Sequence, residues 1–187
     1  YAVFPFVEGD IAEFGISLVE ANAQKKMRGK KPVHPVFVHD RQRARFAAWI
    51  YQNSSNFFSN AEKDALRFLQ HVSTASNARE NFEGVSSENV IVQIMGHGLP
   101  GEKSLSSGGE STTVAEVADL LEMMGLPPGS RRHVDACWSG AGKRYLGNDP
   151  DWLTHFRKGT LGDVTDPENS FAAALHAELE RRGLKGT

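Results

Sequence analysis

The sequence predicts an α/β fold built around a mainly parallel sheet, and two short segments carry this prediction. Residues 90–98 read Val-Ile-Val-Gln-Ile-Met-Gly-His-Gly, and residues 133–140 read His-Val-Asp-Ala-Cys-Trp-Ser-Gly. Each is an apolar run that stops at small residues, which is typical of a buried strand. A helical pattern separates the two runs. The crossover rule for strand, helix and strand units then makes both strands parallel.

The helix between these strands is marked at both ends. Thr113 and Glu116 form a capping-box pattern at its start. Gly125 and the prolines shortly after it stop the pattern. One face carries apolar residues at helical spacing: Val114, Val117, Leu121 and Met124.

Another strand and helix are predicted upstream. Residues 32–40 indicate a short strand that ends in a charged turn. Apolar residues follow at helical spacing: Phe46, Trp49 and Ile50. The first 24 residues fit either a strand with a helix or a β hairpin.

Two more helices continue the alternation. Ser59 and Glu62 form a second capping-box pattern, and residues 166–168 mark the start of the last helix. Their inward faces are Leu66, Leu69 and Val72 in the first and Phe171, Leu175 and Leu179 in the second. Residues 73–89 and 100–111 are polar or Gly/Ser-rich and are predicted as loops, the second forming a mobile wall of a cleft.

The composition favours one globular domain with neither nucleic acid nor a membrane as partner. The chain has 187 residues, 40% of them hydrophobic, so residues 1–187 are predicted to form a single domain around one core. In one alternative, residues 1–31 are an accessory or linker segment. With 21 Lys and Arg against 23 Asp and Glu, the net charge of −2 gives no basic field for nucleic acid. No apolar run approaches the roughly 18–20 residues of a membrane span.

His97 and Cys137, the only cysteine, end the two predicted strands. The carboxyl ends of parallel strands share one edge of the sheet, where open parallel sheets bind ligands. A thiol becomes a nucleophile when a nearby histidine takes its proton, and that histidine can then protonate a leaving amine. This pair predicts a cysteine peptidase. The alternatives are an inert buried thiol and a hydrogen-bonded histidine at the end of a strand.

No metal or cofactor is predicted. One cysteine cannot form an internal disulfide or a zinc site built on several thiolates. The histidines other than His97 show no spacing typical of metal ligands.

The two motifs together resemble the catalytic segments of the caspase-like (clan CD) cysteine peptidases, which include metacaspases, clostripain, gingipains, legumains and self-processing toxin domains. Gly-His-Gly at 96–98 and Asp-Ala-Cys-Trp-Ser-Gly at 135–140 are most similar to the metacaspase and clostripain versions. The resemblance covers residues 88–142. It implies a three-layer caspase-like fold in which a mainly parallel sheet is flanked by helices.

The resemblance also implies roles for single residues. Cys137 would be the nucleophile, His97 the catalytic histidine, and the backbone N–H groups of Gly98 and Cys137 the oxyanion hole. In metacaspase-like and clostripain-like members, the acid two residues before the nucleophile helps to bind a basic P1 side chain. Asp135 would therefore select Arg or Lys, and strand alternation puts it on the same face as Cys137. The alternative is that Asp135 pairs with a nearby cation: Arg131, Arg132 or Lys143.

Asp40 also ends a predicted strand and is a candidate for orienting the imidazole of His97. The alternative for Asp40 is an N-cap of the following helix.

Two rival functions would keep the same residues. One is a non-catalytic caspase-like interaction module, and the other is a Cys/His acyltransferase or transglutaminase-type enzyme. The peptidase itself would act on protein or peptide substrates. Because self-processing toxin domains respond to a small host molecule, an activating small molecule or protein is a further expected partner.

Residues 24–31, Gln-Lys-Lys-Met-Arg-Gly-Lys-Lys, are predicted as an exposed basic linker. In an enzyme that cleaves after Arg or Lys this stretch would be a self-processing site, and a solvated linker or import-type patch is the alternative. The free thiol favours a reducing compartment, which suits either a cytoplasmic protein or a secreted effector or toxin fragment.

Overall fold

The computed structural model describes residues 1–58, 60–98, 102–136 and 169–184, and the backbone alone at 61 and 62. The described residues form a five-stranded sheet in the order β3-β2-β1-β4-β7, in which every neighbouring pair is parallel. The strands are β1 (Ala2–Phe4), β2 (Pro35–Phe37), β3 (Ser73–Thr74), β4 (Ile91–Met95) and β7 (Arg131–Asp135). The predicted α/β fold with a mainly parallel sheet is confirmed.

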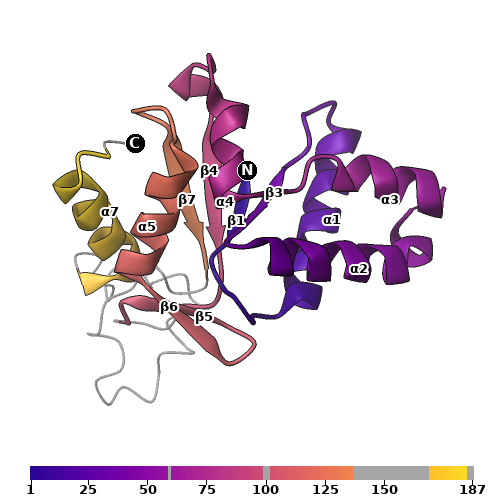
Figure 1. Cartoon of the computed structure of the whole chain (residues 1–187), viewed down its shortest axis with the longest axis horizontal. Coiled ribbons are helices and arrows are strands. Elements are labelled where there is room, and N and C mark those ends of the chain that lie inside the picture. Colours follow the sequence, from indigo (N-terminus) through magenta and orange to yellow (C-terminus); the bar gives the residue numbers. More distant parts are fainter. Residues whose placement is uncertain (59, 99–101, 137–168, 185–187) are drawn as a thin grey trace, which may run out of the picture.

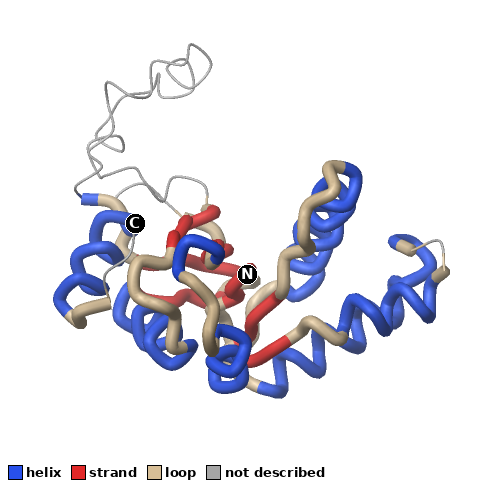
Figure 2. Tube along the Cα trace, turned by 90° about the horizontal axis from the view of Figure 1, so that it is seen from above, coloured by secondary structure: helices blue, strands red, loops and turns tan. Residues whose placement is uncertain are grey.

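Helices cover both faces of this sheet (Figure 1). One face is covered by α1 (Ile11–Met27) and α2 (Asp40–Phe57), with α3 (Ala61–Leu69) packed on α2. The other face is covered by α5 (Val114–Met124), with α4 (Ala75–Ala78) and α7 (Phe171–Arg181) packed on α5. Figure 2 shows the two helical layers on either side of the strands from above. The arrangement has three layers, as expected from the sequence.

The unit β4-α5-β7 confirms the predicted crossover. β4 and β7 pair in parallel from Ile91 beside Arg131 to Met95 beside Asp135, so both strands end at one edge. Thr113 and Glu116 form the predicted capping box, with Thr113 N–H donating to Glu116 at 2.7 Å. Gly125 ends the helix in the left-handed region at φ +63°, where a Cβ would be strained.

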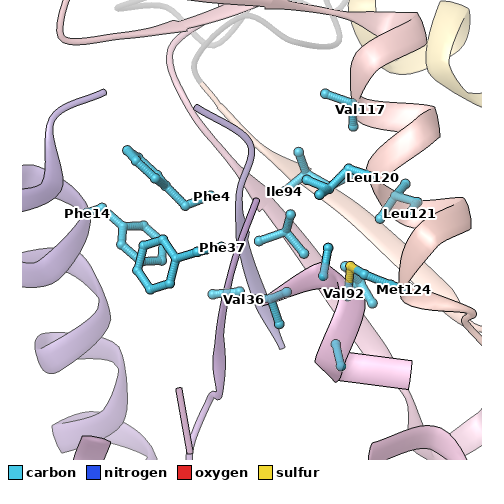
Figure 3. Close-up of a cluster of buried hydrophobic side chains, with 14 of the residues drawn as sticks. Phe4, Phe14, Val36, Phe37, Val92, Ile94, Val117, Leu120, Leu121 and Met124 are labelled. Atoms are coloured by element: carbon cyan, nitrogen blue, oxygen red, sulfur yellow. The ribbon is translucent and has the colours of Figure 1, made fainter. Parts of the chain in front are cut away.

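The core lies mainly on the two inner faces of the helical layers (Figure 3). Phe4, Phe14 and Phe37 pack together between the sheet and α1. On the other side of the strands, Val92 and Ile94 of β4 face the apolar stripe of α5. That stripe contains the buried residues Val117, Leu121 and Met124, as predicted.

Residues 1–27 contribute a strand to the sheet and a helix to one helical layer, and residues 28–31 follow that helix. β1 lies between β2 and β4, and its three residues are buried. α1 packs against α2. The ambiguity of the first 24 residues is thus resolved as a strand followed by a helix, whose last turns include residues 24–27 of the expected basic linker.

Two stretches predicted as loops contain regular structure. Residues 73–89 form β3, α4 and two short 3-10 helices, Arg79–Phe82 and Ser87–Asn89. After His97, β5 (Ser104–Ser107) and β6 (Glu110–Thr113) form an antiparallel hairpin. Its turn is Gly108-Gly109, with φ +57° and +85°, which glycine adopts at low cost.

The other helix boundaries follow the predictions with small shifts. Asn60 is the N-cap of α3, one residue after the expected Ser59, which is outside the described residues. The last helix begins after the cap Ser170, whose Oγ accepts from Ala173 N–H at 3.2 Å, so its start lies beyond residues 166–168. Its inward face is confirmed as Phe171, Leu175 and Leu179.

Candidate active site

A cleft of about 290 Å³ lies between α1 and the carboxyl ends of β1, β4 and β7. Its apolar lining includes Phe4, Phe14 and Leu18, and its ionisable lining consists of Glu13, His97 and Asp135. Ala136, the last described residue before Cys137, also lines it. The structure therefore brings His97 and Asp135 to one cleft at the expected edge of the sheet.

His97 is held at both its backbone and its side chain. Its N–H donates to Ser106 O at 2.7 Å and its carbonyl accepts from Ser106 N–H at 2.8 Å, so it forms an isolated bridge with β5. Its Nε2 lies 2.8 Å from Oε2 of Glu13, and about half of each side chain is exposed. The position just before it needs a glycine, because a Cβ on Gly96 would lie 2.8 Å from the ring of Phe6.

The Glu13 contact selects a tautomer of His97. An ionised carboxylate only accepts hydrogen bonds, so Nε2 carries the proton that is donated to Glu13. In the neutral ring, Nδ1 then has its lone pair available as a proton acceptor. This is the state that a general base requires.

Glu13 reaches His97 because α1 begins beside it. Asp10 is the N-cap, and its Oδ1 accepts from the N–H groups of Ala12 at 2.9 Å and Glu13 at 3.0 Å. Asp10 N–H in turn donates to Ser107 Oγ at 3.0 Å. The first turn of α1 is thereby fixed to the hairpin that also bonds the backbone of His97.

Glu110 of β6 strengthens the same connection. Its carboxylate accepts from the N–H groups of Val7 at 2.8 Å and Glu8 at 2.5 Å. These two residues belong to the loop between β1 and α1. The hairpin thus holds both members of the Glu13–His97 pair.

Asp135 is exposed at the end of β7 and pairs with neither nearby arginine. Arg131 donates to Glu88 O at 3.1 Å, and Arg132 donates to Leu184 O at 2.9 Å. Lys143, the third expected cation, is outside the described residues. Among the described residues no ion pair involves the Asp135 carboxylate, which leaves it open to the cleft.

The expectation that Asp40 orients His97 is corrected by these contacts. Asp40 is the first residue of α2, and its Oδ1 pairs with Nη2 of Arg43 at 2.8 Å. It is not the N-cap either, because that position is His39. The physical reason is the strand order: Asp40 follows β2, which is separated from β4 by β1.

Of the two residues predicted to form the oxyanion hole, the structure describes one. Gly98 follows His97 and is buried. Cys137 is outside the described residues. The oxyanion hole of Gly98 and Cys137 therefore stays a prediction.

Glu13 is the residue that the sequence did not single out. Asp10 and Glu13 have the spacing of a helix N-terminus, which would have placed Glu13 in a first turn. Nothing local indicates that this turn faces His97, since the two residues are 84 positions apart.

Within the described ranges, no group of three His, Cys, Asp or Glu side chains could hold a metal ion. Nor does any described helix have the length and apolar character to cross a membrane. Compared with known proteins, the chain matches no family model, no curated protein and no solved structure.

Proposed function

We propose that this chain is a cysteine endopeptidase in which Cys137 is the nucleophile and His97 the general base and acid. The observation that carries the proposal is that His97, bonded to a carboxylate, lines the same cleft as Ala136. Cys137 is the next residue in the sequence after Ala136. The three-layer α/β architecture is compatible with the caspase-like resemblance of the two motifs.

The proposed reaction divides amide hydrolysis into two steps. The imidazole of His97 takes the thiol proton, and the sulfur of Cys137 attacks the carbonyl carbon. Protonated His97 gives its proton to the leaving amine, the C–N bond breaks, and a thioester remains. His97 then takes a proton from water, whose oxygen attacks the thioester carbon. The C–S bond breaks, the carboxylic acid is released, and protonated His97 returns its proton to the sulfur of Cys137.

Further donors and acceptors support the two steps. The N–H groups of Gly98 and Cys137 would stabilise the negative oxygen of each tetrahedral intermediate. Glu13 is assigned as a positioning residue, because its carboxylate contacts the imidazole of His97 and selects its tautomer.

A basic P1 side chain fits the charges of the cleft. Its lining contains the carboxylates of Glu13 and Asp135, and neither lysine nor arginine is among the described lining residues. Glu13 is already bonded to His97, so Asp135 is the carboxylate available for a guanidinium or ammonium group. We therefore propose cleavage after Arg or Lys.

Within residues 24–31, we propose self-processing only at residues 28–31. Residues 24–27 are the last helical residues of α1, and a helix must unwind before a protease can bind it in extended form. Residues 28–31 follow the helix and include Lys30 and Lys31. An intact mass that stays unchanged through long incubation of active enzyme would reject this proposal.

The test is hydrolysis of short fluorogenic peptides ending in Arg, Lys, Asp, Asn or Leu under reducing conditions. We expect cleavage after Arg and Lys, and a fall of about a thousandfold or more for both Cys137→Ala and His97→Ala. His133→Ala is the matched control, because this exposed histidine of β7 does not line the cleft and should leave activity unchanged.

Other outcomes identify the rivals. Cleavage after a different residue would keep the nucleophile and reject the role of Asp135. Transfer of the acyl group to an added amine in place of hydrolysis would indicate an acyltransferase or transglutaminase-type enzyme. No turnover of any peptide by the wild type would reject an enzyme that is active by itself and favour either a latent enzyme that needs an activator or the interaction module.

A further inference from the structure

A second cleft, of about 460 Å³, lies on another side of α1 from the candidate active site and extends toward the C-terminal end of that helix. It is formed by the C-terminal half of α1 and the turn after it, the end of α2, and α3 (Figure 1). Lys26, which lines it, is 13 positions along the helix from Glu13, which corresponds to about 20 Å. Its volume is that of a site for one small molecule.

One side of this second cleft is aromatic. Phe57, Phe58 and Phe68 line it and are half-buried, so part of each ring remains open. The Phe57 and Phe58 rings are 6.4 Å apart at their centroids, and those of Phe58 and Phe68 are 6.1 Å apart. The Phe58 ring is inclined by 75° to that of Phe57 and by 46° to that of Phe68, so a flat ligand ring can stack on one of the three and contact another at its edge.

The rim of the second cleft is cationic. It carries Lys26, Lys30 and Arg67 against one carboxylate, Asp64. Neither lysine has an ion pair among the described residues, and Arg67 Nη1 is 3.7 Å from Asp64 Oδ1, a long contact. In a chain of net charge −2, this local excess of positive charge is a candidate anion site.

The turn after α1 sets the position of Lys30 on this rim. Gly29 has φ +63°, and Lys30 N–H donates to Lys25 O at 2.9 Å, which reverses the chain at the end of the helix. Lys31, the next residue, is also exposed but does not line the cleft. Lys30 therefore lines the second cleft whereas the equally exposed Lys31 does not, so substitutions of the two can be compared.

The side-chain amide of Asn22, which lines the second cleft, is already hydrogen-bonded to the backbone of Val33. Asn22 Nδ2 donates to Val33 O at 3.1 Å, and Asn22 Oδ1 accepts from Val33 N–H at 2.6 Å. Asn22 is therefore not available to form hydrogen bonds with the edge of a ligand ring. Recognition would rest on the face of a ring and on negative charge.

We propose that this second cleft binds a nucleoside phosphate, with the base stacked on the phenylalanines and the phosphates on Lys26, Lys30 and Arg67. Lysine serves phosphate as a point charge, and arginine can form two parallel hydrogen bonds with it. Because no amide is free to read the base, adenine and guanine nucleotides should bind alike. The proposal stands independently of the peptidase activity.

The test is calorimetric titration of the wild type with ADP, GDP, adenosine and pyrophosphate. We expect ADP and GDP to bind with similar affinity, each at least about tenfold more tightly than adenosine or pyrophosphate, since each half of the ligand contributes. Lys30→Glu should weaken ADP about tenfold or more, because it replaces a charge-assisted contact by repulsion. Lys31→Glu is the matched control and should change ADP binding less than about twofold.

Phe58→Leu tests the aromatic side while keeping an apolar side chain of similar size. It should weaken ADP and leave pyrophosphate unchanged. No binding of ADP at millimolar concentration would overturn the proposal. The proposal would also be overturned if pyrophosphate bound as tightly as ADP, or if Lys30→Glu and Lys31→Glu had equal effects. Either result would indicate non-specific attraction of the anion to positive charge and no specific nucleotide site.

Discussion

The two faces of strands β4 and β7 differ sharply. Toward α5, β4 presents Val92 and Ile94, which are completely buried. Toward α1, the same strand presents Gln93 and Met95, which are only half-buried, and Ile91, which is 40% exposed. Because side chains alternate along a strand, one pair of strands can stabilise the fold with one face and form a site with the other.

The open face extends beyond the candidate active site. A separate hollow of about 460 Å³, distinct from the second cleft described above, continues along this face toward the start of the strands and is lined by Ile91, Gln93 and His133. On β7 the residues of this face, Arg131, His133 and Asp135, are all exposed. We expect substitutions on the α5 face to act on stability, and substitutions of those α1-face residues that line the candidate active site to act on activity.

The largest effect is expected from Ile94→Ala, on the α5 face. Ile94 is fully buried, and its truncation leaves a cavity, so the free energy of unfolding should fall by about 2–5 kcal/mol. Gln93→Ala, one residue away on the open face, should change it by less than about 0.5 kcal/mol. Urea unfolding measures both. Equal losses would show that the two faces do not differ in packing.

Glu13→Gln should lower activity and spare stability. The amide no longer selects the tautomer of His97, so we expect kcat to fall about 10- to 100-fold with little change in KM, less than in buried triads because both side chains are half exposed. Glu20→Gln, an exposed change further along α1, is the control. A rise in KM with unchanged kcat would instead assign Glu13 to substrate binding.

Glu110→Ala should affect both properties, because the hairpin holds the loop before α1. Loss of the bonds from the Val7 and Glu8 N–H groups should lower the free energy of unfolding by about 1–2 kcal/mol. Peptide cleavage should fall with it, since Glu13 would no longer be held against His97. Glu102 is exposed and makes no such contacts among the described residues, so Glu102→Ala should change neither the free energy of unfolding nor the rate of turnover, as measured by chemical denaturation and peptide cleavage.

The smallest expected effect is a pH dependence of stability that arises from Glu178 on α7, the helix packed on α5. Hydrogen bonds from Arg181 and then Arg182 lower the pKa of Glu178 from 4.5 to about 2. A lowered pKa in the folded state stabilises the protein above pH 4.5, and this contribution is lost as the pH falls toward 2. The melting temperatures of wild type and Glu178→Gln should therefore converge between pH 5 and pH 2.5. A constant difference across this range would contradict the shift.

Much of the fold could be predicted because its signals are local. The capping box of Thr113 and Glu116, the stop at Gly125 and the apolar stripe between them depend on residues within three or four positions. The apolar run in residues 90–98, which stops at small residues, likewise predicted the strand β4. The hairpin at 104–113 was missed, although its Gly-Gly turn between short alternating segments is a hairpin signal.

The candidate site could be predicted only in part, for a related reason. The sequence by itself determined that His97 ends a strand parallel to the one before Cys137, because the crossover rule links consecutive strands. Only the tertiary structure decided which acid meets the imidazole. Glu13 does so because β1 lies directly beside β4, whereas Asp40 follows β2, one strand further away. The order of strands is set by how the whole chain buries its apolar surface, which no short stretch of sequence contains.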